Sequence, residues 1–271
     1  MHKVAFSIGS LAIHWYGLLA AAGFMLGSWT AGRRGERYGL DRQTVLDSTM
    51  WIVIGVIVGS RLFYCITYWD EMMQNPAFPS APWLEIFMLR RGGLVFYGGL
   101  VGSVVAVLLF TWHRGVDRWQ LGDALAPSGA LGAAFGRFGC LMSGCCYGRP
   151  TDLPWAIHFP ADHPTAGIGV HPCQLYDAFL SLCLYAFLAW VHQRKKFDGQ
   201  VFCLLVMIYP INRSLVEFFR GDYGTHYVAG TITPAHWLSL VSLALGAFFY
   251  WYLRDRGLIS EKDSPTDAES R

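Results

Sequence analysis

Several charged residues lie inside long apolar runs of the sequence, among them Arg61, Asp123, Arg137, Arg213 and Glu217. A charge in hydrocarbon costs so much free energy that such a residue is a functional-site hypothesis by default. Arg213 and Glu217 are four residues apart, so on a helix they would also neutralise each other, and Arg61 and Asp123 form a second possible pair. The pattern indicates buried ion pairs, a membrane-embedded site for a charged ligand, or both.

Arg137 is the strongest candidate for a ligand contact, because Gly132, Gly136, Gly139 and Gly144 surround it. Glycines let a backbone approach closely and permit a kinked helix. A guanidinium donates two parallel hydrogen bonds to a phosphate and keeps its charge when it is partly desolvated. We therefore expect Arg137 to bind a phospholipid headgroup, with structural packing as the alternative.

A second reactive group consists of Cys140, Cys145 and Cys146, with His171 and Cys173 further along the chain. Zinc sites usually draw on compact paired ligands, and the chain contains no Cys-x-x-Cys motif, so we expect no metal ion and no other cofactor. A disulfide on an oxidising face and a covalent thiol intermediate are the remaining alternatives.

The composition requires a membrane around these residues. Only 15% of the 271 residues are charged and 54% are hydrophobic, whereas soluble domains contain about 25% charged residues. These values exclude an ordinary soluble enzyme and a disordered protein. A net charge of +2, with scattered basic residues, also argues against a nucleic-acid partner.

Seven windows are apolar over about 20 residues, the length that crosses the hydrocarbon core. They are 11–30, 45–68, 92–112, 121–146, 171–191, 200–219 and 234–253. In lipid only helices and closed barrels satisfy the backbone, and these runs do not alternate, so we predict an all-α polytopic membrane protein with about seven transmembrane helices. This domain is expected at 1–256, followed by a disordered cytoplasmic tail at 257–271. A cleaved signal peptide over 1–23 is an alternative for the first window.

Loop charges and glycines add orientation and packing. Most basic loop residues follow the first, third and fifth windows, so we expect the N-terminus outside and the C-terminus in the cytoplasm. Gly55 with Gly59, and Gly132 with Gly136, are small-xxx-small pairs that predict close helix packing.

Six short motifs follow one another along the chain: IHWYGL at 13–18, GGLVFYGGL at 92–100, GRFG at 136–139, YGR at 147–149, HPCQLY at 171–176 and RSLVEFFR at 213–220. In order and spacing they resemble the prolipoprotein diacylglyceryl transferase family over nearly the whole chain. The resemblance implies a bacterial inner-membrane enzyme that moves the diacylglyceryl group of phosphatidylglycerol to the lipobox cysteine of a preprolipoprotein, with release of glycerol phosphate. Its implied partners are phosphatidylglycerol, the lipobox segment and membrane lipid.

The resemblance also assigns residues. The expected catalytic residues are Tyr16, Tyr97, Arg137, His171 and Arg220. The expected substrate-binding residues are Arg137 together with Arg61, Gly98, Gly99, Asp123, Gly139, Gln174, Tyr176 and Glu217.

Two departures from the family pattern leave the chemistry open. Tyr97 stands where the family has a histidine, and a tyrosine with a pKa near 10 is a poor base at neutral pH. Cys140, Ser143 and Cys145 stand where the family has Asn, Asn and Glu. His171 is then the nearest imidazole by motif position, with a structural role as the alternative. A related phospholipid-modifying transferase with another donor or acceptor, and a non-catalytic lipid-binding protein, are the competing functions.

Overall fold

The computed structural model describes residues 4–9, 11–74, 82–88, 92–221 and 234–262. The chain forms two compact units, one from Met1–Arg34 with Gly122–Arg271 and the other from Gly35–Leu121. Helices α1 (Trp15–Glu36) and α5 (Arg118–Ser143) lie mostly in the first unit, which also contains β1 (Val4–Ile8), β2 (Leu11–His14), β3 (Ile157–His158), β4 (Gly169–Val170), α6 (Cys173–His192), α7 (Gln200–Glu217) and α8 (Pro234–Lys262). The second unit contains α2 (Arg42–Thr67), α3 (Trp69–Gln74), the 3-10 helix η1 (Pro82–Phe87) and α4 (Phe96–Arg114).

The chain is an all-α membrane protein. Each of the seven predicted windows overlaps a helix, and three helical segments among the described residues are long and apolar enough to cross a bilayer: Arg42–Thr67, Cys173–His192 and His236–Arg256. Large apolar side chains such as Ile66, Trp112 and Phe179 are exposed on the helices, as a lipid-facing surface requires. The full count of seven spans stays a prediction.

The bounds of the first and last helices differ from the predicted windows. The window at 11–30 begins too early, because Leu11–His14 forms β2, which pairs antiparallel with β1 through a turn where Gly9 has a φ of 60°. At the other end, α8 continues to Lys262. The predicted tail from 263 onward lies outside the described residues.

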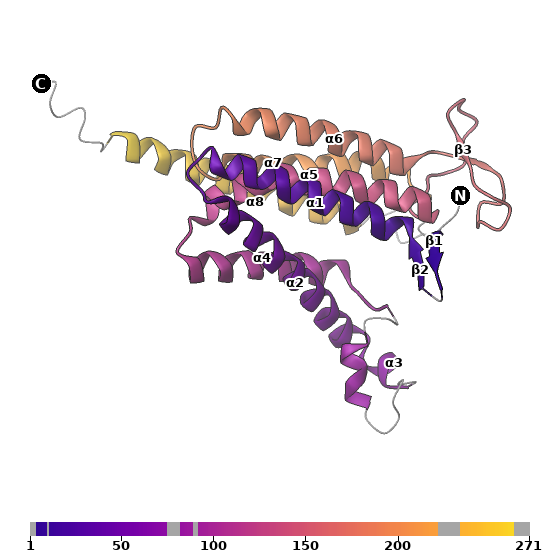
Figure 1. Ribbon diagram of the computed structural model, residues 1–271. Coiled ribbons are helices and arrows are strands. Elements are labelled where there is room, and N and C mark those ends of the chain that lie inside the picture. The colour runs from indigo at the N-terminus through magenta and orange to yellow at the C-terminus, as the bar shows by residue number, and fades with distance from the viewer. Residues whose placement is uncertain (1–3, 10, 75–81, 89–91, 222–233, 263–271) are drawn as a thin grey trace, which may run out of the picture. The chain divides into compact units, whose positions relative to one another are not determined.

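In the first unit, α1, α5, α6, α7 and α8 run alongside one another (Figure 1). Glycines bring α1 against α5: a Cβ on Gly23 would lie 2.6 Å from Cβ of Phe135. Between α5, α6 and α7, the buried side chains of Ala130, Leu188 and Val201 belong to one apolar cluster. This packing fixes the ends of the helices, where the polar residues lie.

In the second unit, α2 packs closely on α4 through glycines. A Cβ on Gly59 would clash with the Gly98 carbonyl, and a Cβ on Gly102 would clash with the Gly55 carbonyl. The predicted packing role of Gly55 and Gly59 is therefore confirmed. For Gly132 and Gly136 in α5 it is wrong, because a Cβ on either would meet no described atom within 4 Å.

Candidate functional site

A short extended segment at 147–149 joins two motifs that are distant in sequence. On one side, the amide of Gly148 donates to the carbonyl of His171 (3.0 Å). On the other, the amide of Arg149 donates to the carbonyl of Phe219 (2.8 Å), and Gly148 pairs with Arg220 as an antiparallel bridge. A Cβ on Gly148 would lie 2.5 Å from Cβ of His171. The glycine thus permits the backbone contact that brings the start of α6 to the end of α7.

Arg137 and Asp177 form a buried ion pair between α5 and α6. Nε of Arg137 lies 2.7 Å from Oδ2 of Asp177, and the two side chains are 18% and 4% exposed. Within the described residues the terminal Nη1 and Nη2 atoms of Arg137 have no hydrogen-bond partner. The pair fixes the guanidinium and leaves its two-nitrogen edge available for an anion.

Asp177 was missed in the sequence reasoning. The signal that identifies it is the same one that identifies Arg137: a carboxylate inside the apolar window at 171–191.

Tyr16 of α1 lies close to the stretch of α5 that contains Arg137. It stands in the first turn of α1, half-exposed, and its ring rests on the backbone of Gly139 in α5. A Cβ on Gly139 would lie 2.7 Å from Cδ2 and 3.3 Å from Cα of Tyr16. Gly139 is therefore a positioning residue for Tyr16.

Arginines outnumber carboxylates at this end of the first unit. Nη1 of Arg213 lies 2.6 Å from Oε2 of Glu217, which confirms the pairing expected from their spacing, and Nη1 of the buried Arg220 lies 3.9 Å from the same oxygen. All three arginines, Arg137 included, act electrostatically on Asp177. Three guanidinium groups and two carboxylates leave a net positive site, which favours an anionic ligand.

His171, Gln174 and Tyr176 surround the start of α6. Nδ1 of His171 lies 3.3 Å from the Tyr176 hydroxyl, which accepts a hydrogen bond from the indole of Trp155 (2.8 Å). Nε2 of Gln174 donates to the carbonyl of Cys145 (2.7 Å). These contacts tie the α6 motif to the chain that follows α5.

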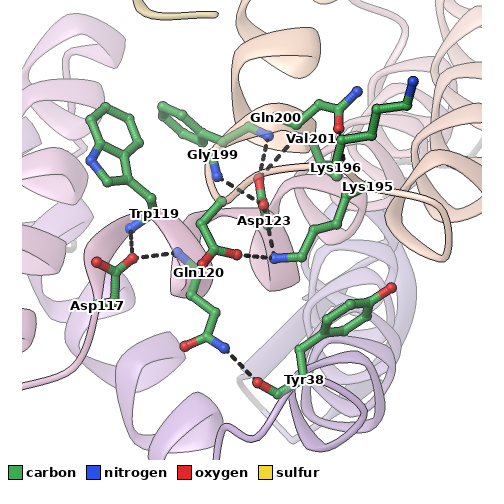
Figure 2. Close-up of polar contacts among 12 residues, drawn as sticks. Tyr38, Asp117, Trp119, Gln120, Asp123, Lys195, Lys196, Gly199, Gln200 and Val201 are labelled. Carbon is green, nitrogen blue, oxygen red and sulfur yellow. Dashed lines mark hydrogen bonds and ion pairs between the residues drawn. The ribbon is translucent and has the colours of Figure 1, made fainter. Parts of the chain in front are cut away.

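Asp123 lies at the opposite end of α5, where it has a structural role (Figure 2). Its carboxylate is fully buried, lies 3.1 Å from Nζ of Lys195, and accepts hydrogen bonds from the amides of Gly199, Val201 and Phe202 at the start of α7. Burial alone would lower the pKa of Lys195, but the contacts with Asp198 and Asp123 raise it above its usual value. Lys195 is thus the partner of Asp123, in place of the Arg61 considered from the sequence.

Four expected site residues belong to the second unit. Arg61 donates to the backbone carbonyls of Ile86 and Gly92 (2.8 Å each), so it holds the segment that leads into α4. Gly98 and Gly99 pack against α2. Tyr97 stands in the first turn of α4, partly exposed.

The end of α5 brings the side chains of Cys140, Cys145 and Cys146 close together. The amide of Gly144 donates to the carbonyl of Leu141 (3.2 Å) and that of Cys145 to the carbonyl of Cys140 (3.1 Å), while Gly144 has a φ of 72°. This is the Schellman motif that ends helices at glycine. It folds the chain back so that the sulfur atoms of Cys140, Cys145 and Cys146 lie within 4.8 Å of one another. No disulfide joins them.

Comparison with known proteins gives matches over most of the chain. The family model described as prolipoprotein diacylglyceryl transferase matches residues 3–252. A phosphatidylglycerol–prolipoprotein diacylglyceryl transferase of Bordetella parapertussis is 38% identical over 92% of this chain and 94% of the relative. Proteins with the same description from Synechococcus elongatus and Clostridium tetani are 34% and 31% identical, over 88% and 92% of this chain and 83% and 97% of the relatives.

Proposed function

The chain belongs to the prolipoprotein diacylglyceryl transferase family, and on this premise we propose that it transfers diacylglyceryl from phosphatidylglycerol to the lipobox cysteine of a preprolipoprotein. The products are a thioether on the cysteine and glycerol phosphate. The observation that carries the proposal is the guanidinium of Arg137, which Asp177 holds through Nε beside the positive charge of Arg220.

The two arginines have the main chemical task. The acceptor sulfur attacks the glyceryl carbon that bears the phosphate, the carbon–oxygen bond breaks, and negative charge gathers on the departing phosphate. Donors that are fixed before the reaction stabilise such a charge without reorganisation. Arg137 offers two parallel donors to the phosphate, and Arg220 adds a second positive charge.

Two further residues, Tyr16 and His171, act directly on the reactants in this proposal. Tyr16 directs its hydroxyl toward the donor lipid, and His171 takes the proton of the acceptor thiol, because a neutral imidazole is a suitable base near pH 7. A catalytic role of Tyr97 stays a prediction from its place in the GGLVFYGGL motif. Supporting roles at the site fall to Gly139, Gln174, Tyr176 and Glu217. Asp123 instead holds the opposite end of α5. Within the second unit, Arg61, Gly98 and Gly99 hold the segments around α2 and α4.

In this proposal, the end of the first unit that contains Arg137, Asp177 and Arg220 faces the outer side of the membrane. The enzyme lies in the bacterial inner membrane with its N-terminus outside, and the residues that follow α8 lie in the cytoplasm together with the C-terminus. The distribution of basic loop residues supports this orientation, because Lys and Arg are retained on the cytoplasmic side. The connection that contains Lys195 and Lys196 then lies in the cytoplasm.

Complementation tests the function in cells. A bacterium depleted of its own diacylglyceryl transferase should grow when it expresses this chain, and should fail to grow with Arg137→Ala. Arg114→Ala is the matched control, because this exposed arginine pairs with Asp47 in the second unit and should support growth.

A membrane-inserted wild type that does not restore growth would favour a related transferase with another donor or acceptor. A protein that retains lipid in an Arg137-dependent manner without any turnover would be a lipid-binding protein.

A further inference from the structure

Packing does not explain the convergence of Cys140, Cys145 and Cys146. Cys145 is exposed, and the other two are only partly buried. Cys146 has a φ of 63°, a backbone conformation that side-chain-bearing residues rarely adopt and that costs about 1–3 kcal/mol. A strained backbone that directs an additional thiol toward two others, next to a proposed active site, suggests a function for the thiols.

The spacing of the three sulfur atoms fits a metal ion. With zinc–sulfur bonds of about 2.3 Å, ligands of a tetrahedral site lie about 3.8 Å apart. The sulfurs already lie within 4.8 Å of one another, so shifts of less than about 1 Å would complete the site. Three protein ligands with an open fourth position are typical of catalytic zinc, whereas structural zinc has four.

The surroundings suit the charge and leave room for a ligand. Zinc with three thiolates carries a net charge of −1, and the guanidinium groups of Arg220 and Arg137 both act electrostatically on Cys146. Gln174 fixes the carbonyl of Cys145 through Nε2. Its buried Oε1 accepts no hydrogen bond within the described residues. This oxygen of Gln174 can therefore accept a hydrogen bond from a bound molecule.

We propose that Cys140, Cys145 and Cys146 bind a zinc ion whose open fourth position takes the acceptor cysteine as a thiolate. The catalytic part of this inference rests on the proposed function. A thiol that coordinates zinc is deprotonated, and its proton passes to His171. The bound sulfur then forms its bond to the glyceryl carbon, the carbon–oxygen bond breaks, and glycerol phosphate leaves with the electron pair. No oxidant or reductant is needed, and zinc supplies the activation that Tyr97, as a weak base, does not.

Metal binding is tested without lipid or peptide. The full chain, purified in detergent under reducing conditions and stripped with a chelator, should take up one equivalent of Zn²⁺. Co²⁺ as a substitute should give sulfur-to-metal charge-transfer absorption. Cys145→Ser should weaken binding by more than about 10-fold without altering thermal stability of the metal-free protein, because Cys145 is exposed. Cys183→Ser, at an exposed cysteine of α6, is the matched control and should bind like the wild type.

Several results would overturn the site. They are the absence of stoichiometric Zn²⁺ binding, equal binding by Cys145→Ser and Cys183→Ser, uptake of Cu(I) without Zn²⁺, and a mass lower by two hydrogens that shows a disulfide among the three cysteines.

The catalytic role has its own readout. The stripped protein should lose peptide transfer and recover it with Zn²⁺, whereas Arg137→Ala should bind Zn²⁺ and remain inactive. Full transfer by the stripped protein would refute thiol activation. Stoichiometric Zn²⁺ binding without transfer under any condition would refute the proposed function and leave the metal site standing.

Discussion

Replacing Gly139 with alanine should displace Tyr16 and thereby lower activity. The new Cβ would lie 2.7 Å from Cδ2 and 3.3 Å from Cα of Tyr16, whereas carbon atoms pack at about 3.5–4.0 Å. The start of α1 must therefore move by about 1 Å. A displacement of that size at a reacting centre can lower the rate about 100-fold, which corresponds to about 2.7 kcal/mol of transition-state stabilisation.

Gly132→Ala is the matched control, since it lies in the same helix and its Cβ would meet no described atom within 4 Å. It should keep full activity and gain up to about 1 kcal/mol of helix stability, whereas Gly139→Ala should lose about 1–3 kcal/mol through overpacking. The assay is the initial rate of peptide modification, with thermal unfolding measured alongside. Equal rates for the two variants would refute the placement of Tyr16 against Gly139.

Three further outcomes are expected. Asp177→Asn should lower kcat/KM at least about 10-fold by removing a charged contact of about 1.5–3 kcal/mol that positions the guanidinium of Arg137; unchanged peptide-transfer kinetics would contradict this. Asp123→Ala should destabilise the fold by about 3–5 kcal/mol because it removes the buried carboxylate that pairs with Lys195, whereas Asp198→Ala, at an exposed position, should cost about 1 kcal/mol or less in detergent unfolding curves. Tyr97→His should preserve or raise the transfer rate if the tyrosine only occupies the position of a base, and complete loss of activity would show that its hydroxyl has a task of its own.

The sequence predicts the helices and the Arg213–Glu217 pair, because both depend on local periodicity. Apolar windows of membrane length can satisfy their backbone only as helices. Residues four apart on a helix lie next to each other whatever the tertiary structure. These features need no knowledge of which helix lies beside which.

The missed features depend on contacts between segments or on backbone turns. The partner of Asp123 is Lys195. In the sequence, Lys195 is one of several basic loop residues, and these indicate only the orientation of the chain in the membrane. Glycine pairs look alike in sequence, yet Gly55 faces another helix and Gly132 does not. The thiols of Cys140 and Cys145 lack a metal-binding spacing on a continuous helix and meet only because the helix ends at Gly144 in a Schellman motif.

Product analysis with purified protein tests the central claim most directly. The chain in detergent is incubated with phosphatidylglycerol and a lipobox peptide, and the peptide mass and released glycerol phosphate are measured together. The account predicts a diacylglyceryl increment on the peptide cysteine and equimolar glycerol phosphate, both absent in Arg137→Ala and present in Arg114→Ala. Neither product from the wild type, under conditions where a known transferase works, would contradict it.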